Sequence, residues 1–236
     1  MISTKHRTNA PEIMDDFSLE GNLLLDALDK IAKINQWLGG NKLTLKGVEK
    51  LIQNIPKTTP ICIIDLGCGN GDMLRSLAEY GLANQREFKL IGIDANPFTV
   101  NYAKESSNDY TNIEYLSEDI FEFDYEDYAI DIVLCTLTLH HFKDEQILKI
   151  MQTLNNNVRI GIVVNDLHRN TIAYRLFQLI CFLFQLNPMS KEDGLTSILR
   201  GFKKNELTAF SKKLKLTSYT IAWKWAFRYQ WIIYKL

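Results

Sequence analysis

The sequence predicts an α/β fold in which helices cover a mostly parallel sheet. Short apolar runs alternate with helix-periodic segments between residues 61 and 165, which is typical of parallel strands joined by crossover helices. A glycine-rich turn, Gly67 to Gly71, stands directly between the first run and its helix. The last two strand candidates, residues 216–223 and 228–234, are joined too tightly for a crossover and predict an antiparallel pair. These segments predict a single domain, residues 1–236, with seven strands.

The first 58 residues predict a helical N-terminal extension ahead of the sheet. Residues 1–18 are polar and irregular in pattern, and apolar positions then repeat at helical spacing over residues 19–38. Gly39 and Gly40 supply a stop, and a second helix is predicted over residues 44–54.

Residues 59–165 form the predicted core of the domain. Strands are expected at residues 61–65, 89–94, 113–116, 130–137 and 159–164. Helices are expected at residues 72–80, ended by Gly81, then from Pro97 to about residue 106 with Asn96 as N-cap, and at residues 144–155.

The pattern changes after Asn165, and residues 166–205 are predicted to form an inserted lid. An apolar helix at residues 171–186 is followed by a loop at 187–202, which contains Pro188, Gly194 and Gly201. Residues 206–236 then supply a short helix at 206–214 and the final strand pair. Aromatic side chains at alternate positions in that pair are interpreted as two covered strands rather than a nucleic-acid stacking surface.

Composition and charge indicate neither a nucleic-acid nor a membrane partner. The chain has 27 basic and 28 acidic residues, with a formal net charge of −1, and the basic run at residues 203–215 is interpreted as a solvated helix face. The start has no apolar signal core, and the most apolar run, residues 172–186, is interrupted by polar side chains and short for a bilayer. We therefore expect no integral membrane segment and a cytoplasmic location.

The cysteines are expected to be reduced. Cys62, Cys68, Cys135 and Cys181 form no CxxC pair, and three of them lie in or beside predicted strands. This arrangement favours small core residues in a reducing compartment over disulfides or a zinc site. No other group of residues has the spacing of a metal site, so no metal is predicted.

The chemistry of the chain centres on the segment Asp65-Leu66-Gly67-Cys68-Gly69-Asn70-Gly71. Glycines let a turn close and allow main chain to approach a ligand. A dinucleotide fingerprint, G-x-G-x-x-G/A, fails here because Asp72 occupies its third small position. The turn therefore predicts a nucleotide-like ligand of another kind.

This segment resembles motif I of the class I S-adenosylmethionine-dependent methyltransferases, and the resemblance covers about residues 60–165. It implies a Rossmann-like three-layer sandwich and S-adenosylmethionine as the cofactor. Asp65 would bind the methionine ammonium, Asp94 the ribose hydroxyls, and Asp119 with the Ile120 backbone the adenine. The implied cofactor site comprises Asp65, Gly67, Cys68, Gly69, Gly71, Asp94, Ala95, Asp119, Ile120, Thr136 and Leu137. From the residues alone, Asp65 and Asp94 could instead be capping residues, and Glu118 could replace Asp119.

Two adjacent histidines, His140 and His141, follow the fourth predicted strand. In this family the end of that strand faces the sulfonium and the substrate, and paired histidines also occur in quinone-biosynthesis methyltransferases. A phenol has a pKa near 10, and a neutral imidazole can take its proton. One of the two histidines is therefore the candidate catalytic base, with a purely structural role for both as the alternative.

Four further segments resemble methyltransferases associated with type III polyketide synthases: residues 11–15, 35–40, 165–169 and 193–200. The resemblance implies methylation of a hydroxyl on a phenolic or pyrone polyketide, a small-molecule acceptor. The polar residues expected to orient it are Asn165, Asp166, His168, Arg169, Asp193 and Arg200. Carbon methylation of a quinone precursor and a non-catalytic binding protein remain alternatives, with a dinucleotide oxidoreductase the weakest. The oligomeric state stays open, with a homodimer as one option.

Overall fold

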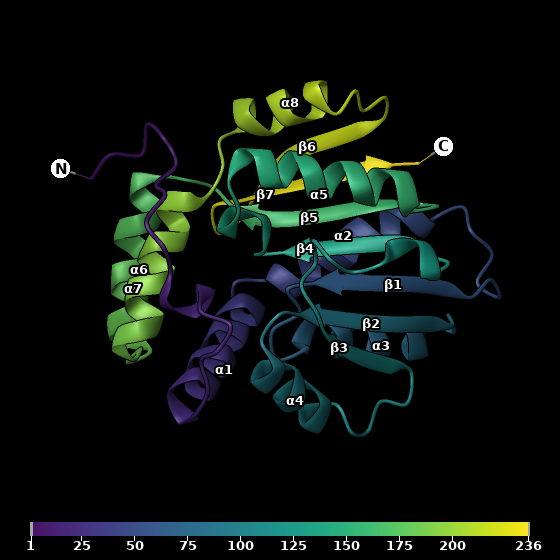
Figure 1. Ribbon diagram of the computed structural model, residues 1–236, viewed down its shortest axis with the longest axis horizontal. Helices are drawn as coiled ribbons and strands as arrows, with labels where there is room; N and C mark the ends of the chain where they lie inside the picture. Colours follow the sequence, from purple (N-terminus) through teal and green to yellow (C-terminus); the bar gives the residue numbers. More distant parts are fainter. Residues whose placement is uncertain (1, 236) are drawn as a thin grey trace.

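The computed structural model describes residues 2–235 and contains a seven-stranded sheet (Figure 1). The strand order is β3-β2-β1-β4-β5-β7-β6, and only the pairings made by β7 are antiparallel. The strands are β1 Ile61–Leu66, β2 Phe88–Asp94, β3 Ile113–Ser117, β4 Ile132–Thr136, β5 Gly161–Leu167, β6 Tyr219–Lys224 and β7 Arg228–Tyr234. The predicted fold class, including the antiparallel C-terminal pair, is confirmed.

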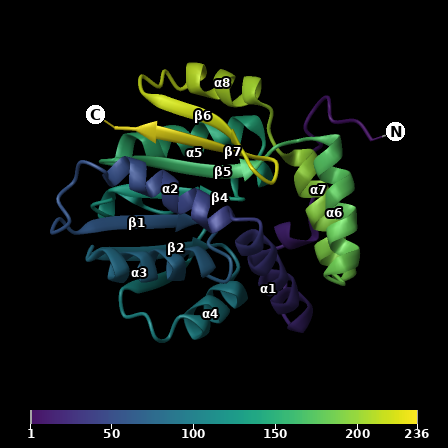
Figure 2. The same cartoon turned by 180° about the vertical axis from the view of Figure 1, so that it is seen from behind.

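Helices cover both faces of the sheet, which makes three layers (Figures 1 and 2). The α-helices are α1 Asn22–Trp37, α2 Gly40–Ile52, α3 Asp72–Asn84, α4 Pro97–Ser106, α5 Asp144–Asn157, α6 Thr171–Leu183, α7 Pro188–Arg200 and α8 Lys204–Lys213. α2, α3 and α4 pack on one face, and α5 and α8 on the other. Three short 3₁₀ helices are also present: η1 Ile13–Asp15, η2 Tyr125–Asp127 and η3 Leu139–His141.

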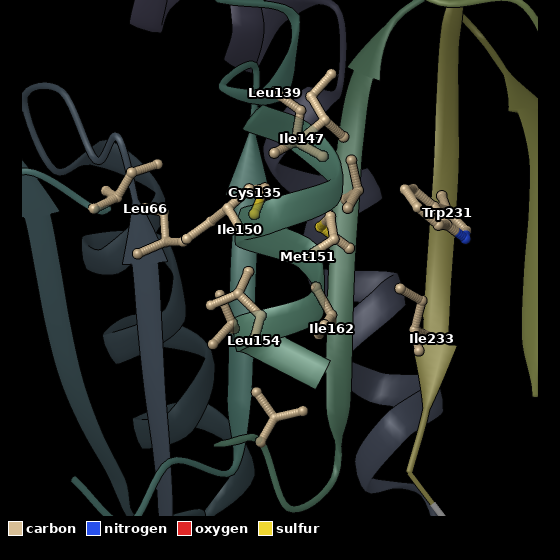
Figure 3. Close-up of a cluster of buried hydrophobic side chains, with 14 of the residues drawn as sticks. Leu66, Cys135, Leu139, Ile147, Ile150, Met151, Leu154, Ile162, Trp231 and Ile233 are labelled. Atoms are coloured by element: carbon tan, nitrogen blue, oxygen red, sulfur yellow. The ribbon is translucent and has the colours of Figure 1, made fainter. Parts of the chain in front are cut away.

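Helical periodicity explains how α5 covers the sheet. Ile147, Ile150, Met151 and Leu154 recur at spacings of three and four, so all four lie on one face of α5 and are fully or almost fully buried. Figure 3 shows them lying over β4 and β5, beside Trp231 of β7.

Several predicted boundaries and one predicted loop are wrong. α3 continues through Gly81 to Asn84, because Gly81 serves close packing: a Cβ there would lie 3.0 Å from the Arg86 carbonyl oxygen. Residues 188–200 form α7 rather than a loop. Pro188 occupies the first turn, where proline is tolerated, and Asn187 caps the helix by accepting from the Ser190 amide.

The final strand pair is covered only in part. β7 is buried along nearly its whole length, whereas β6 is an edge strand, so the prediction of two covered strands holds for one of them. Trp223, near the end of β6, and Trp225, directly after it, are 52% and 75% exposed. Within residues 2–235, no helix is long and apolar enough to cross a membrane.

The lid and the N-terminal segment lie together beyond the carboxyl ends of the strands. α6 and α7 stand side by side, α1 packs against α7, and the N-terminal segment with η1 also contacts α7 (Figure 1). Segments from both ends of the sequence therefore enclose the same edge of the sheet.

Candidate active site

A cavity of about 660 Å³ opens at the carboxyl ends of β1, β4 and β5. The strand order reverses between β1 and β4, and ligands of open α/β sheets bind at such a switch point. The floor is the turn after β1, and α1, α6 and α7 contribute apolar walls.

The glycine turn is shaped by close contacts. Gly67 and Cys68 donate their amides to the Ile93 carbonyl at 2.8 and 3.1 Å, which ties the turn to β2. Gly67 and Gly69 have φ of 66° and 53° and line the cavity beside Cys68. Gly71 does not line it: a Cβ there would lie 2.0 Å from the Tyr115 hydroxyl oxygen, so its predicted cofactor contact gives way to a packing role.

Buried carboxyl groups gather around this turn. Asp65 is 2% exposed, its Oδ1 has no hydrogen-bond partner, and burial next to Asp72 and Asp94 raises its pKa well above the usual range. Asp94 accepts from the amides of Gly69 and Asn96 at 3.1 Å each, and burial raises its pKa as well. Uncompensated buried carboxyl groups are suited to a cationic ligand, so these residues fit S-adenosylmethionine.

The remaining predicted cofactor residues also line the cavity. Ala95, Asp119, Ile120, Thr136 and Leu137 all do so, which places the predicted adenine, ribose and methionine contacts around one space. Glu118, the alternative to Asp119, does not. Leu137 adopts a φ of 58° directly after β4.

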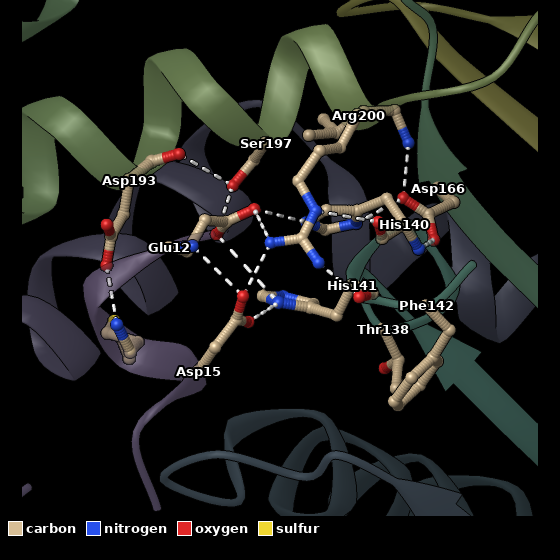
Figure 4. A network of polar contacts seen from close by, with 12 residues as sticks. Glu12, Asp15, Thr138, His140, His141, Phe142, Asp166, Asp193, Ser197 and Arg200 are labelled. Atoms are coloured by element: carbon tan, nitrogen blue, oxygen red, sulfur yellow. Dashed lines mark hydrogen bonds and ion pairs between the residues drawn. The ribbon is translucent and has the colours of Figure 1, made fainter. Parts of the chain in front are cut away.

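The two histidines are each held through Nδ1 by a carboxylate (Figure 4). His140 Nδ1 lies 2.7 Å from Asp166 Oδ1, and His141 Nδ1 lies 2.7 Å from Asp15 Oδ1. A carboxylate only accepts, so we assign the proton to Nδ1 in both rings and the free lone pair to Nε2. His140 is 2% exposed and its Nε2 has no hydrogen-bond partner, whereas the His141 side chain is 28% exposed; both line the cavity.

An N-terminal segment completes this network, and sequence reasoning did not assign its residues to the site. Glu12 and Asp15 flank the histidines, and Glu12 Oε1 lies 3.8 Å from His140 Nε2. Asp193 anchors the segment by accepting from the amides of Ile13 and Met14 at 2.6 and 2.9 Å. Ser197 donates to Glu12 Oε2 at 2.7 Å (Figure 4). The spacing of residues 193 and 197 fits one helical turn, but Pro188, Gly194 and Gly201 favour a loop when the sequence is taken alone.

Charge in the network is distributed unevenly. Burial opposes ionisation of Asp166, but the electrostatic interaction and hydrogen bond with His140 outweigh it and hold the pKa of Asp166 below its usual range. The pKa of Asp15 is lowered likewise, because bonds to His141 and Arg200 outweigh burial. Glu12 behaves oppositely, since burial raises its pKa. Asp15 and Asp166 are therefore fixed carboxylates, while Glu12 is the more basic group.

Of the six side chains predicted to orient the substrate, His168 and Asp193 line the cavity and the other four do not. Asn165 donates to the Gly40 carbonyl and to Thr44 Oγ1, each at 3.0 Å, and so ties β5 to α2. Asp166 holds His140 instead of facing the cavity. In both cases a neighbouring element binds the polar group: α2 binds Asn165, and His140 of η3 binds Asp166.

The two arginines of that prediction also have other roles. Arg169 is fully buried and pairs with Glu206 at 2.6 Å. Arg200 pairs with Asp15 at 2.6 Å and donates to the carbonyls of His140 and His141, so it links α7 to both the N-terminal segment and the histidine pair.

Glu12, His140 and His141 also offer ligand atoms that lie within 4.8 Å of one another. Arg200 Nη1 lies only 3.4 Å from Glu12 Oε1, and the positive charge of this guanidinium opposes the binding of a metal cation there. The absence of a metal stays a prediction.

Known structures share this fold. The plantazolicin methyltransferase BpumL, solved with S-adenosylhomocysteine, matches with a TM-score of 0.67 and 16% identity over 89% of each chain. The magnesium protoporphyrin IX methyltransferase of Synechocystis PCC 6803 matches with a TM-score of 0.57 and 15% identity over 84% of each. Over 113 residues, 44% of this chain, the sequence is 28% identical to the small RNA 2′-O-methyltransferase of Arabidopsis thaliana, of which the match spans only 12%.

The family model described as a methyltransferase domain matches residues 59–205, which is more than half of the chain. That range contains the glycine turn, the buried carboxyl groups and the histidine pair. The chain therefore belongs to this family of methyltransferase domains.

Proposed function

We propose that this protein is an S-adenosylmethionine-dependent methyltransferase that modifies a hydroxyl group of a small, largely hydrophobic acceptor of the phenolic or polyketide type. The observation that carries the proposal is the pair of carboxylate-held imidazoles at the carboxyl end of β4, inside a cavity with mostly apolar walls. When bound, S-adenosylmethionine supplies an electrophilic methyl group on a sulfonium cation.

His141 is the better candidate for the base. Its ring is partly open to the cavity, and Asp15 fixes the tautomer that leaves Nε2 free to accept a proton. The resulting imidazolium would be stabilised by Asp15, as in other histidine–carboxylate pairs. His140 is enclosed between Asp166 and Glu12 and supports the arrangement.

The acceptor class rests on the walls of the cavity. Apolar side chains of α1 and α6 line it, so most of a bound acceptor would meet apolar surface; they include Leu28, Ile31, Phe177 and Ile180. Enzymes with this fold act on acceptors as different as plantazolicin and magnesium protoporphyrin IX. The fold therefore does not select the acceptor, and the link to type III polyketide synthases is part of the proposal.

The test is product analysis with methyl-labelled cofactor and a panel of phenols, resorcinols, pyrones and quinols. We expect the label on oxygen, and we expect His141→Ala to lower turnover by about 10²- to 10⁴-fold while S-adenosylhomocysteine binds unchanged. Label on carbon would favour the quinone-precursor alternative. Full activity of a His140→Ala/His141→Ala double variant would remove the base from the mechanism, and cofactor binding without transfer to any acceptor would favour a binding protein.

A further inference from the structure

Arg228, the first residue of β7, carries a buried charge that residues 2–235 leave unpaired. The residue is 3% exposed, and its Nε and Nη1 are buried without a hydrogen-bond partner. Its side chain forms no ion pair with any of residues 2–235, and yet the residue lines the cavity. Burial lowers its pKa to about 10, so the guanidinium is still charged at neutral pH.

Arg169 shows how this fold treats a buried arginine that has only a structural role. It is fully buried, pairs with both carboxylate oxygens of Glu206, and donates to main-chain carbonyls, including those of Thr4 and Gly201. Removing a guanidinium from water without such partners is costly. The contrast indicates that the partner of Arg228 comes from outside the chain.

Asp166, whose charge acts on Arg228, cannot serve as the hydrogen-bonded partner of this guanidinium. Asp166 acts on Arg228 only through its charge, without an ion pair. Both of its oxygens are already engaged, one by His140 Nδ1 and the Leu167 amide, the other by the His140 amide.

The position of Arg228 points to the acceptor rather than the cofactor. In the sheet, β4 and β5 separate β7 from β1, and three strand spacings amount to roughly 14 Å. Asp65 and the glycine turn lie at the end of β1, whereas Arg228 pairs with Leu167 on β5, next to the lid. Leu167 and Phe227 line the cavity beside it.

We propose that Arg228 binds an anionic oxygen group of the methyl acceptor, a carboxylate or an enolate, and so selects acidic acceptors. The inference rests on the proposed function, because it needs an acceptor in this cavity. A guanidinium forms charge-assisted hydrogen bonds to such a group, and these are stronger than bonds to a neutral oxygen.

The test compares matched anionic and neutral probes for binding, not for methyl transfer. Calorimetry with the full chain and saturating S-adenosylhomocysteine would use hydroxybenzoates and hydroxyphenylacetate, each against its primary amide. We expect each carboxylate to bind at least about tenfold more tightly than its amide. Arg228→Met should remove this preference, and Arg228→Lys should keep part of it. Equal binding of the two members of each pair, or no binding of any carboxylate at millimolar concentration, would overturn the proposal even if the protein methylates other compounds.

A second measurement separates recognition from a structural role. Replacing an unpaired buried charge with a side chain of similar length should leave the unfolding temperature of the ligand-free protein unchanged or raise it. Arg228→Met should therefore keep or raise the unfolding temperature, whereas the matched control Arg169→Met should lower the unfolding temperature. A fall in Arg228→Met as large as in the control would overturn the proposal. So would a loss of S-adenosylhomocysteine affinity in Arg228→Met, which would place the guanidinium on the cofactor.

Discussion

Asp193→Ala should release the N-terminal segment that brings Asp15 to His141. The Asp193 carboxylate is buried and accepts from the Ile13 and Met14 amides at 2.6 and 2.9 Å. Hydrogen bonds to a charged group contribute about 1.5–3 kcal/mol each, so the two together contribute about 3–6 kcal/mol while the segment stays docked. The segment can lift and bring both amides to water, so we expect the lower end of that range.

A loss of about 3 kcal/mol corresponds to roughly 100-fold faster local opening, because each 1.4 kcal/mol is a factor of ten. Hydrogen exchange of residues 8–16 should accelerate by that factor. Turnover should fall at least about tenfold as His141 loses its carboxylate. S-adenosylhomocysteine affinity should hold, since its expected contacts lie on the sheet.

The matched control is Asp16→Ala. Asp16 is exposed on the same segment, and within residues 2–235 its side chain bonds only to Ser18, so neither exchange nor turnover should change. Faster exchange in Asp193→Ala with full turnover would refute the role of the segment in catalysis. Unchanged exchange would refute the anchoring role of Asp193.

Four further outcomes are expected. Asp94→Ala should weaken S-adenosylhomocysteine binding by about 100-fold in calorimetry, since the two expected charge-assisted bonds to the ribose hydroxyls are lost. Gly71→Ala should lower the free energy of unfolding in urea by about 2–4 kcal/mol, because its Cβ meets the Tyr115 hydroxyl at a φ of 77°. The raised pKa of Asp65 means that the folded state keeps a proton that the unfolded chain releases. The stability of the ligand-free protein should therefore fall as pH rises from the usual aspartate pKa through the raised one. In thermal unfolding, Asp65→Asn should flatten that dependence on pH. Chelator treatment should leave turnover unchanged, and metal analysis checks that no ion survives it.

The sheet could be predicted because its signals are local. Each strand from β1 to β5 is a short apolar run, and Asn96-Pro97 marks the start of α4 with a cap and a first-turn proline. The glycine turn and Asp65, Asp94 and Asp119 could be placed for the same reason, since each lies at or just beyond the carboxyl end of a strand.

The acceptor side could not be predicted as well, because it is assembled from distant segments. Glu12 and Asp15 are held beside the histidines by bonds to α7, some 180 residues further along the chain. Pro188 and Gly194 look like loop residues in the sequence, although the proline fits the first turn of α7 and the glycine admits the Phe177 ring. The isolation of Arg228 is equally invisible in the sequence, since it depends on which carboxylates are already engaged.

The most direct test of the central claim is the pH dependence of methyl transfer to a phenolic acceptor, measured with labelled cofactor in the wild type and in His141→Ala. If His141 removes the hydroxyl proton, the wild type should transfer the methyl group at a pH well below the phenol pKa, and the variant should require a pH near that pKa. An unchanged profile in a folded, cofactor-binding His141→Ala protein would contradict the account.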